Sequence, residues 1–293
     1  MHEIAVLEYR FSSEIQTEIQ ALASNKIAFP VALCPQNERV SRTGKASIAL
    51  VTPWDKIDAA YLDACPQLRY VGLCGTSTAN IDLQELKRRG IAFSNVVSNN
   101  KQSVAEFFFM QLVSLARGLG EYQWKKGEQH ELAGKRIGII GLGAVGQAVA
   151  HLALAYKMDI AYHSPHRKQA WEDKGLMYLD KKELLRTSDI VVLCAPTNVE
   201  VLGAPEFQAI QQGKILVQAS SGNPFNQTAF YNWIAKEGNY AIFDMSAGED
   251  NCRAYRDIPG VIFSTVVAGD TYESNVRRGQ HVIQNLKHFL DIE

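Results

Sequence analysis

Three glycines, Gly141, Gly143 and Gly146, have the G-x-G-x-x-G spacing of a phosphate-binding turn between an apolar run and a helical run. In such a turn the first glycine permits a tight bend, and the second lets the backbone approach a pyrophosphate. The third allows the helix and the strand to pack closely, and the helix N-terminus offers free N–H groups. A glycine-rich turn without a ligand is the alternative. We expect a dinucleotide to bind at Gly141, Gly143, Ala144, Val145 and Gly146.

The end of the next expected strand, residues 159–164, bears on the form of the cofactor. A carboxylate normally stands there and binds the ribose 2′-hydroxyl. This chain has a basic loop of small residues instead, which would attract a 2′-phosphate. The sequence therefore favours NADP(H) over NAD(H), with Arg167 or His166 as the contact and Ser164 beside them. Alternatively, Arg167 and Lys168 only solvate a surface turn.

A parallel sheet is needed to position these residues, and apolar runs alternate with helical runs as in βαβ units. A helix at 12–24 is capped by Ser12 or Ser13, and residues 180–188 carry a capping-box pattern at Asp180 and Glu183. After an apolar helix at 103–118, six strands predict a complete doubly wound sheet. The strands are expected at 3–9, 47–52, 69–74 and 91–96, and then at 136–141, 159–164, 190–196, 215–220, 240–245 and 261–267.

Length and composition limit the class of protein. The chain has 293 residues, of which 46% are hydrophobic and 21% charged, as in a globular protein of two domains. A formal net charge of -1 argues against nucleic acid or an anionic membrane as a partner. The five cysteines form no metal-ligand cluster and are interpreted as buried thiols. Because Glu3 and Glu8 interrupt the N-terminal apolar run, we expect no signal peptide and a cytoplasmic protein.

Four segments together resemble the D-isomer-specific 2-hydroxyacid dehydrogenase family. Residues 80–95 resemble its NIDL...GI.V.N segment, 103–107 its hinge helix, 131–146 its nucleotide turn and 242–250 its L-D-V-F-x-x-E segment. The resemblance implies an α/β fold in which a Rossmann doubly wound parallel sheet is inserted in a flavodoxin-like substrate domain. The implied Rossmann domain covers residues 99–270, and the substrate domain covers 1–98 plus 271–293.

The resemblance also implies that the two domains close around NAD(P)H and a 2-oxo acid. It places Asp244 near the nicotinamide amide, and Cys194 at the lip that faces the nicotinamide. Cys194 is interpreted as a structural thiol rather than a nucleophile. Residues 121–135 are shorter than the dimerisation arm of many relatives, which weakens the inference of the family's usual dimer without excluding a homodimer. The implied cofactor contacts beyond the glycine turn are Ser164, His166, Arg167, Cys194, Ala195, Pro196, Ser220 and Asp244.

Two of the three catalytic residues that the family uses are missing. Ser221 stands at the position of the arginine that grips the substrate carboxylate, and Val266 at the position of the histidine that protonates the carbonyl. Ser221 cannot neutralise a carboxylate, and Val266 cannot transfer a proton. Only Glu249 remains. In an apolar cleft a carboxyl group favours its protonated form, so Glu249 could act as the acid itself. Alternatively, it is an evolutionary remnant or a solvated loop carboxylate.

The expected substrate loop also departs from the family's G-x-G-V-D pattern. It reads Gly75, Thr76, Ser77, Thr78 and Ala79. Its hydroxyl groups could hold a small anionic or hydroxylated ligand, or they could cap the local backbone.

Two functions fit these observations. The first is an NAD(P)-dependent oxidoreductase that transfers hydride to a small carbonyl compound in a divergent active site. The second is a catalytically inactive NADP(H)-binding sensor or interaction protein, in which the cofactor sets domain closure. Oxidation of bound NADPH by any added compound distinguishes the two functions. The sequence contains no motif that identifies the substrate.

Overall fold

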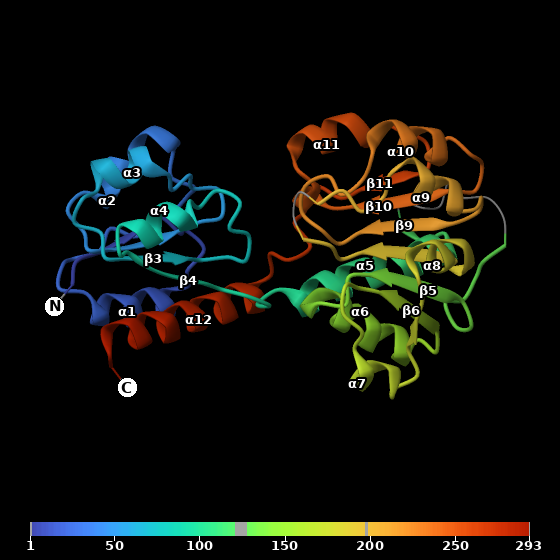
Figure 1. Ribbon diagram of the computed structural model, residues 1–293, viewed down its shortest axis with the longest axis horizontal. Coiled ribbons are helices and arrows are strands. Elements are labelled where there is room, and N and C mark those ends of the chain that lie inside the picture. The colour runs from blue at the N-terminus through green and yellow to red at the C-terminus, as the bar shows by residue number, and fades with distance from the viewer. Residues whose placement is uncertain (1, 121–127, 197–198, 293) are drawn as a thin grey trace. The chain divides into compact units, whose positions relative to one another are not determined.

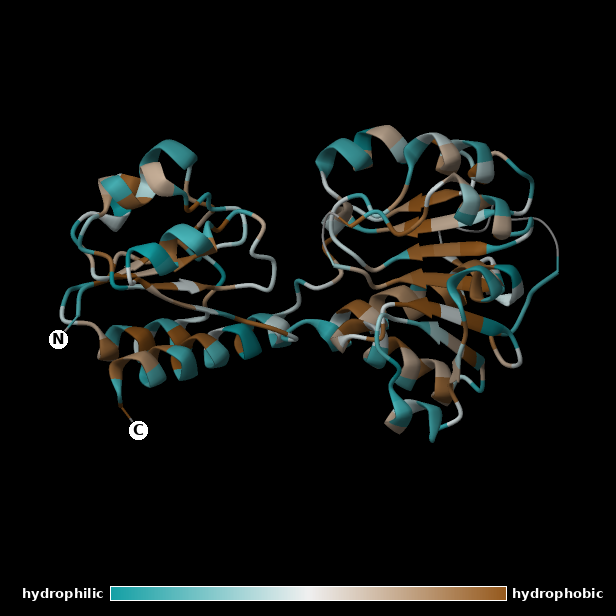
Figure 2. Cartoon of the chain, viewed as in Figure 1, coloured by the Kyte–Doolittle hydropathy of each residue, from teal (hydrophilic) through white to brown (hydrophobic). Residues whose placement is uncertain are grey.

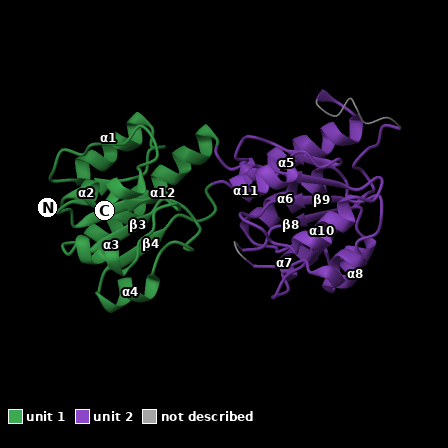
Figure 3. Ribbon diagram, turned by 90° about the horizontal axis from the view of Figure 1, so that it is seen from above, with its two compact units in different colours: residues 1–99, 271–293 green, residues 100–270 purple. Residues whose placement is uncertain are grey.

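The chain folds as two compact α/β units. The computed structural model describes residues 2–120, 128–196 and 199–292. Unit 1 comprises residues 1–99 and 271–293, and unit 2 comprises residues 100–270 (Figure 3). Both units are built on a parallel sheet with helices on its two faces (Figure 1). The predicted fold class is thereby confirmed.

Unit 1 contains a four-stranded sheet in the order β1-β2-β3-β4, with every neighbouring pair parallel. Apolar residues of α1 and α12 pack on one face, and those of α3 and α4 on the other. Ser12 caps α1 as predicted, because its hydroxyl accepts the N–H of Ile15. The elements are β1 Ile4–Val6, α1 Ser13–Leu22, η1 Gln36–Glu38, α2 Arg39–Thr43, β2 Ile48–Val51, α3 Ala59–Ala64, β3 Tyr70–Leu73, α4 Leu83–Arg88, β4 Ala92–Asn95 and α12 Tyr272–Leu290.

Unit 2 contains a seven-stranded parallel sheet in the order β11-β10-β9-β8-β5-β6-β7. We predicted six strands, and this prediction was wrong because the sheet has a seventh. The additional strand is β7 at the edge, which has only two residues and pairs with β6. The elements are α5 Lys101–Arg117, β5 Arg136–Ile140, α6 Ala144–Ala155, β6 Asp159–His163, α7 Gln169–Glu172, β7 Met177–Tyr178, α8 Lys181–Thr187, β8 Ile190–Leu193, α9 Ala204–Ala209, β9 Ile215–Gln218, α10 Gln227–Ile234, β10 Tyr240–Phe243, η3 Met245–Ala247, α11 Glu249–Tyr255 and β11 Val261–Phe263.

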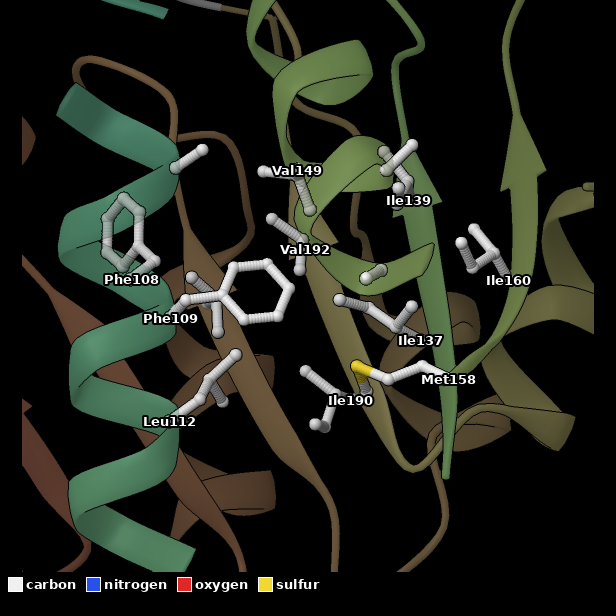
Figure 4. Packing of buried hydrophobic residues seen from close by; sticks show 14 of the residues in the cluster. Phe108, Phe109, Leu112, Ile137, Ile139, Val149, Met158, Ile160, Ile190 and Val192 are labelled. Carbon is white, nitrogen blue, oxygen red and sulfur yellow. The ribbon is translucent and has the colours of Figure 1, made fainter. Parts of the chain in front are cut away.

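The core of unit 2 fixes the strand that carries the glycine turn. Phe109 of α5 and Val149 of α6 point toward Ile137 of β5 in one apolar cluster (Figure 4). All three side chains are almost fully buried. In Figure 2 the central strands of unit 2 are mostly hydrophobic, as expected for a parallel sheet covered on both faces. Because β5 is buried on both sides, the loop at its carboxyl end has a rigid support.

The capping pattern of α8 is only half formed. The carboxylate of Asp180 accepts the N–H of Glu183 at 3.0 Å, as predicted. The Glu183 side chain does not return this contact and pairs instead with Arg186. Of the segment compared with a dimerisation arm, residues 121–127 lie outside the described residues, and a homodimer stays a prediction. Among the helices that the structure describes, none combines the length and the apolar composition needed to cross a membrane.

Candidate functional site

The three glycines of the turn meet three different physical requirements. Gly141 has φ 97°, and a Cβ there would lie 2.5 Å from the carbonyl oxygen of Cys194. A Cβ at Gly146 would lie 2.1 Å from the carbonyl oxygen of Gly141. A Cβ at Gly143 would have no heavy atom within 4 Å. Gly141 and Gly146 are therefore required by the fold, whereas the open side of Gly143 leaves space for a ligand.

Helix α6 begins next to that open space. Gly143 is its N-cap, and the first helical hydrogen bond runs from Gln147 N to Gly143 O at 2.9 Å. The N–H groups of Ala144 and Val145 precede that bond, so they have no acceptor within the helix. Together with the helix dipole they favour an anion at this point. The residues present thus fit the pyrophosphate of a dinucleotide.

The loop after β6 holds its arginine in a fixed position. Arg167 Nε lies 3.1 Å from Glu172 Oε1, and its Nη2 pairs with Oε2 of the same carboxylate. The guanidinium also lies over the ring of Tyr178, 5.1 Å from its centroid. Tyr162 Oη donates to Glu172 at 2.7 Å. The contacts from Arg167 and Tyr162 lower the pKa of Glu172, which therefore carries a negative charge at neutral pH.

The other predicted residues of this loop shape its backbone. Ser164 is buried, and its hydroxyl donates to the carbonyl oxygen of His166 at 2.5 Å. The side chains of His166 and Arg167 are exposed. The sequence did not point to Glu172, which lies five residues beyond Arg167 on a short helix. The sequence signal for this residue is a carboxylate in the turn that follows the loop, rather than at the strand end.

The segment after β8 approaches the glycine turn from the neighbouring strand. Cys194 N donates to Ile140 O at 2.8 Å, and the Cys194 carbonyl faces Gly141. Ala195 is half-buried and Pro196 exposed. Desolvation raises the pKa of the Cys194 thiol to about 12. The thiol therefore stays protonated at neutral pH, which argues against a nucleophilic role.

The loops that follow β9, β10 and β11 are tied to one another at the carboxyl edge of the sheet. Gly222 N donates to Ser246 O at 3.1 Å, and Met245 N donates to Val266 O at 3.1 Å. Ser220 is buried, and its hydroxyl donates to Leu193 O at 3.0 Å. The backbone positions that carry Ser221 and Val266 therefore belong to one hydrogen-bonded set of loops.

Asp244 is the buried centre of this set. Its Oδ2 accepts the N–H of Ala268 at 2.6 Å, and its Oδ1 accepts the N–H of Ser246 at 3.2 Å. The Ser246 hydroxyl also donates to Oδ1. Burial raises the pKa of Asp244, while these hydrogen bonds lower it. Holding the loops is the role that its contacts support, and a contact with the nicotinamide amide stays a prediction.

Ser221, Glu249 and Val266 are exposed within unit 2. Val266 has a relative exposure of 54%. Glu249 is the first residue of α11 and is exposed, so unit 2 does not give it the apolar surroundings that we expected. The serine offers only a neutral hydroxyl group and the valine no polar group, so neither supplies a cation or a general acid.

The expected substrate loop follows β3 in unit 1. A Cβ at Gly75 would lie 2.3 Å from Cγ of Pro53, so this backbone passes close to the loop after β2. Thr76 Oγ1 donates to Val96 O at 3.0 Å, a bond that joins this loop to the segment after β4 and does not cap the loop's own backbone. The side chain of Ser77 is half-buried. A ligand role for the three residues Gly75, Thr76 and Ser77 stays a prediction.

Comparisons with known proteins agree with an α/β fold that carries a nucleotide-binding turn. The family described as "D-isomer specific 2-hydroxyacid dehydrogenase, NAD binding domain" matches residues 108–267. The glyoxylate reductase of Thermococcus kodakarensis is 32% identical over 269 residues, covering 84% of this chain and 80% of that protein. The hydroxypyruvate reductase of Thermotoga maritima is 26% identical over 265 residues, covering 85% and 86%.

A solved structure shares the fold. The D-lactate dehydrogenase of Aquifex aeolicus, solved with NAD and lactic acid, superimposes with a TM-score of 0.79 at 21% identity. The match covers 98% of this chain and 95% of that one. This chain therefore belongs to the D-isomer specific 2-hydroxyacid dehydrogenase family, whose members are nicotinamide-dependent oxidoreductases that act on hydroxyl and carbonyl groups.

Proposed function

We propose that this chain reduces a small carbonyl compound with NADP(H), in a site that lacks the arginine and the histidine usual in its family. The observation that carries the proposal is the turn at Gly143, where open space adjoins the N-terminus of α6. The cofactor supplies the hydride when bound. In this proposal unit 2 holds the cofactor, and unit 1 contributes the substrate loop Gly75, Thr76 and Ser77.

The preference for NADP(H) rests on the loop after β6. Residues 163–168 contain no carboxylate to bind a ribose 2′-hydroxyl, and they contain Arg167. Glu172 and Tyr178 hold the Arg167 guanidinium in one orientation, which lowers the entropy lost when an anion binds. Glu172 also places a negative charge next to the proposed phosphate site. Arg167 should therefore strengthen NADPH binding, and Glu172 should weaken it.

We expect Arg167→Gln to weaken NADPH binding about tenfold and to leave NADH binding nearly unchanged, because only NADPH carries the 2′-phosphate. Glu172→Gln should strengthen NADPH binding several-fold, because it removes the opposing charge. Fluorescence titration of each variant with both cofactors measures these effects.

Arg186→Gln is the matched control, because Arg186 makes the same two-bond pair with Glu183 on the exposed surface of α8. It should change neither affinity. Equal effects of Arg167→Gln on NADPH and NADH would instead assign Arg167 to the general stability of the loop.

Proton delivery must come from a residue other than Val266. We propose Glu249 for this step, because it is the residue of the family's catalytic set that this chain retains. The proton would pass from its carboxyl group to the carbonyl oxygen as the hydride arrives. The serine at residue 221 and the valine at residue 266, in place of an arginine and a histidine, favour the second candidate function, a catalytically inactive NADP(H)-binding sensor or interaction protein.

The absorbance of NADPH, followed with a panel of small 2-oxo acids, aldehydes and ketones, distinguishes the two functions. We expect wild-type protein to turn over at least one compound, and Glu249→Gln to lose that turnover while NADPH still binds. A wild-type protein that binds NADPH but reduces no compound of the panel contradicts the enzyme proposal and supports the sensor.

A further inference from the structure

No cationic side chain is present in the three loops that follow β9, β10 and β11. These loops comprise residues 219–226, 244–248 and 264–270. The structure describes all three, and none of them contains a lysine, an arginine or a histidine. Their charged side chains are those of Asp244 and Asp270. The edge of the sheet that holds residues 221 and 266 therefore offers carboxyl groups and no cation.

Glu249 adds a carboxylate that has no cationic partner. It is the first residue of α11, directly after the loop that follows β10, and its side chain is exposed. No residue that the structure describes forms an ion pair with it. Arg253, the cation of α11, pairs with Asp250 at 2.9 Å. The charge of Glu249 is therefore available to attract a cation.

Hydride addition to a neutral carbonyl group receives little help from these side chains. The carbonyl oxygen gains negative charge as the hydride arrives, and a cation or a general acid normally stabilises that charge. Ser221 and Val266 supply neither. Carboxylates at the same edge oppose the developing negative charge. A carbonyl acceptor therefore depends on the proton of Glu249.

An iminium ion, in which a carbon is doubly bonded to a positively charged nitrogen, has the opposite requirements. Its positive charge is present before the reaction and disappears as the hydride arrives. No negative charge develops, so neither an arginine nor a proton donor is needed. A carboxylate attracts such an ion, whereas an arginine at residue 221 would repel it. The side chains at this edge therefore suit an iminium ion better than a carbonyl compound.

We propose that this site takes an iminium ion as its preferred hydride acceptor, and that Glu249 attracts the ion. The hydride would form a C–H bond at the iminium carbon, and the π electrons of the C=N bond would become a lone pair on nitrogen. Oxidation of NADPH to NADP⁺ balances this reduction. No proton moves in the step, and the neutral amine takes a proton from water after its release.

The inference rests on the proposed function, because it keeps hydride transfer from NADPH at the same site. It goes further by naming the charge and the chemical class of the acceptor. It also gives Glu249 a second role that depends on the acceptor. With a carbonyl compound Glu249 donates a proton, and with an iminium ion it only attracts the positive charge.

The first test compares two ring compounds of similar size. The cyclic imine 2-methyl-1-pyrroline takes up a proton near neutral pH to give an iminium ion, and cyclopentanone is a neutral ketone. We expect kcat/KM with NADPH to be at least about a hundredfold higher for the imine. The N-methylated imine, whose positive charge is permanent, should also be reduced, because the step needs no proton.

Glu249→Gln separates the two acceptors. With the imine it should leave kcat unchanged and raise KM about fivefold to tenfold, because the carboxylate attracts the ion but takes no part in the chemical step. With a carbonyl compound it should abolish turnover, because the proton donor is lost. Glu237→Gln, which removes an exposed carboxylate near the amino end of β10, is the matched control and should change neither KM nor kcat.

A binding measurement gives the same answer without turnover. Pyrrolidinium is a ring cation that cannot accept a hydride. Calorimetric titration of the NADPH-loaded protein with pyrrolidinium should show an affinity that falls about fivefold to tenfold in Glu249→Gln and is unchanged in Glu237→Gln.

A Ser221→Arg, Val266→His double variant controls for the greater intrinsic reactivity of an iminium ion. We expect its kcat/KM for the imine to fall at least about tenfold, because the new arginine repels the ion. Thermal melting and NADPH titration report whether the variant is folded and binds the cofactor.

A wild-type protein that binds NADPH but does not reduce the imine overturns the inference. So does imine reduction that is unaffected by Glu249→Gln and by the double variant. The outcome is separable from that of the proposed function. Imine reduction together with no turnover of any carbonyl compound supports the inference and refutes the carbonyl acceptor. Carbonyl reduction without imine reduction keeps the proposed function and refutes the inference.

Discussion

A Ser221→Arg, Val266→His double variant is expected to reduce glyoxylate with NADPH at a kcat/KM about 10² to 10⁴ times that of the wild-type chain. The arginine would supply a bidentate partner for the carboxylate, and the histidine a general acid for the carbonyl oxygen. A positioned general acid alone is typically worth about 10² to 10⁴ in rate. The measurement is the steady-state decay of NADPH absorbance over a range of glyoxylate concentrations.

The loops that carry these two positions can accept both replacements. They are joined by hydrogen bonds from Gly222 N to Ser246 O and from Met245 N to Val266 O. The carboxylate of Asp244 also accepts the N–H of Ala268. Both replaced side chains are exposed, so longer side chains meet no packed core. Each single variant should gain little, because the two groups act as a unit.

The prediction fails if the double variant melts like wild type, binds NADPH equally well and shows no gain. That result would mean that Ser221 and Val266 do not stand at the family's arginine and histidine positions.

The second large effect is expected at Gly143. Gly143→Ala should weaken NADPH binding by about a hundredfold and leave the melting temperature unchanged. The backbone there, with φ -82° and ψ -159°, suits alanine, and the added methyl group meets no protein atom within 4 Å. The methyl group would instead occupy the space that the pyrophosphate needs. Fluorescence titration and thermal melting separate the two quantities.

Gly141→Ala and Gly146→Ala are the matched controls in the same turn. Each forces a methyl group to within 2.5 Å or less of a backbone oxygen, and Gly141 also has a positive φ. We expect a loss of roughly 3 kcal/mol or more of folding free energy, and a fall of about 6 to 12 °C in Tm. If Gly143→Ala instead lowers Tm as much as these controls do, the open side of Gly143 has a structural purpose and not a binding one.

The glycine turn was predictable because its requirements are local. A positive φ, a close approach of helix and strand, and a free helix N-terminus all occur within six consecutive residues. The fixed G-x-G-x-x-G spacing of these residues therefore predicts all three. The strands of unit 2 were predictable for a similar reason, since both faces of the sheet are covered and the strands read as continuous apolar runs. The strand β7 was not predictable, because two residues are too few to show a periodic pattern of apolar and polar side chains.

The contacts that orient side chains were not predictable. Arg167 meets Glu172 and Tyr178 only because α7 and β7 turn back beside the end of β6. Asp244 reaches Ala268 across 24 residues of sequence. Such pairs depend on tertiary packing, and their residue types and spacings follow no repeated pattern. The sequence predicted that Ser221 and Val266 replace the arginine and the histidine of the family, and it did not predict the exposure of Glu249.

The return of the last helix to unit 1 has a consequence for biosynthesis. On the ribosome, the first 99 residues emerge without α12, whose Val282, Ile283 and Leu286 complete the apolar cluster under β1 and α1. Unit 2 is contiguous and can fold as soon as its last strand is released. The N-terminal unit must therefore wait with an uncovered apolar face until α12 has left the ribosome. This reverses the usual order in which the domains of a nascent chain mature and makes the uncovered face a point at which a chaperone can bind.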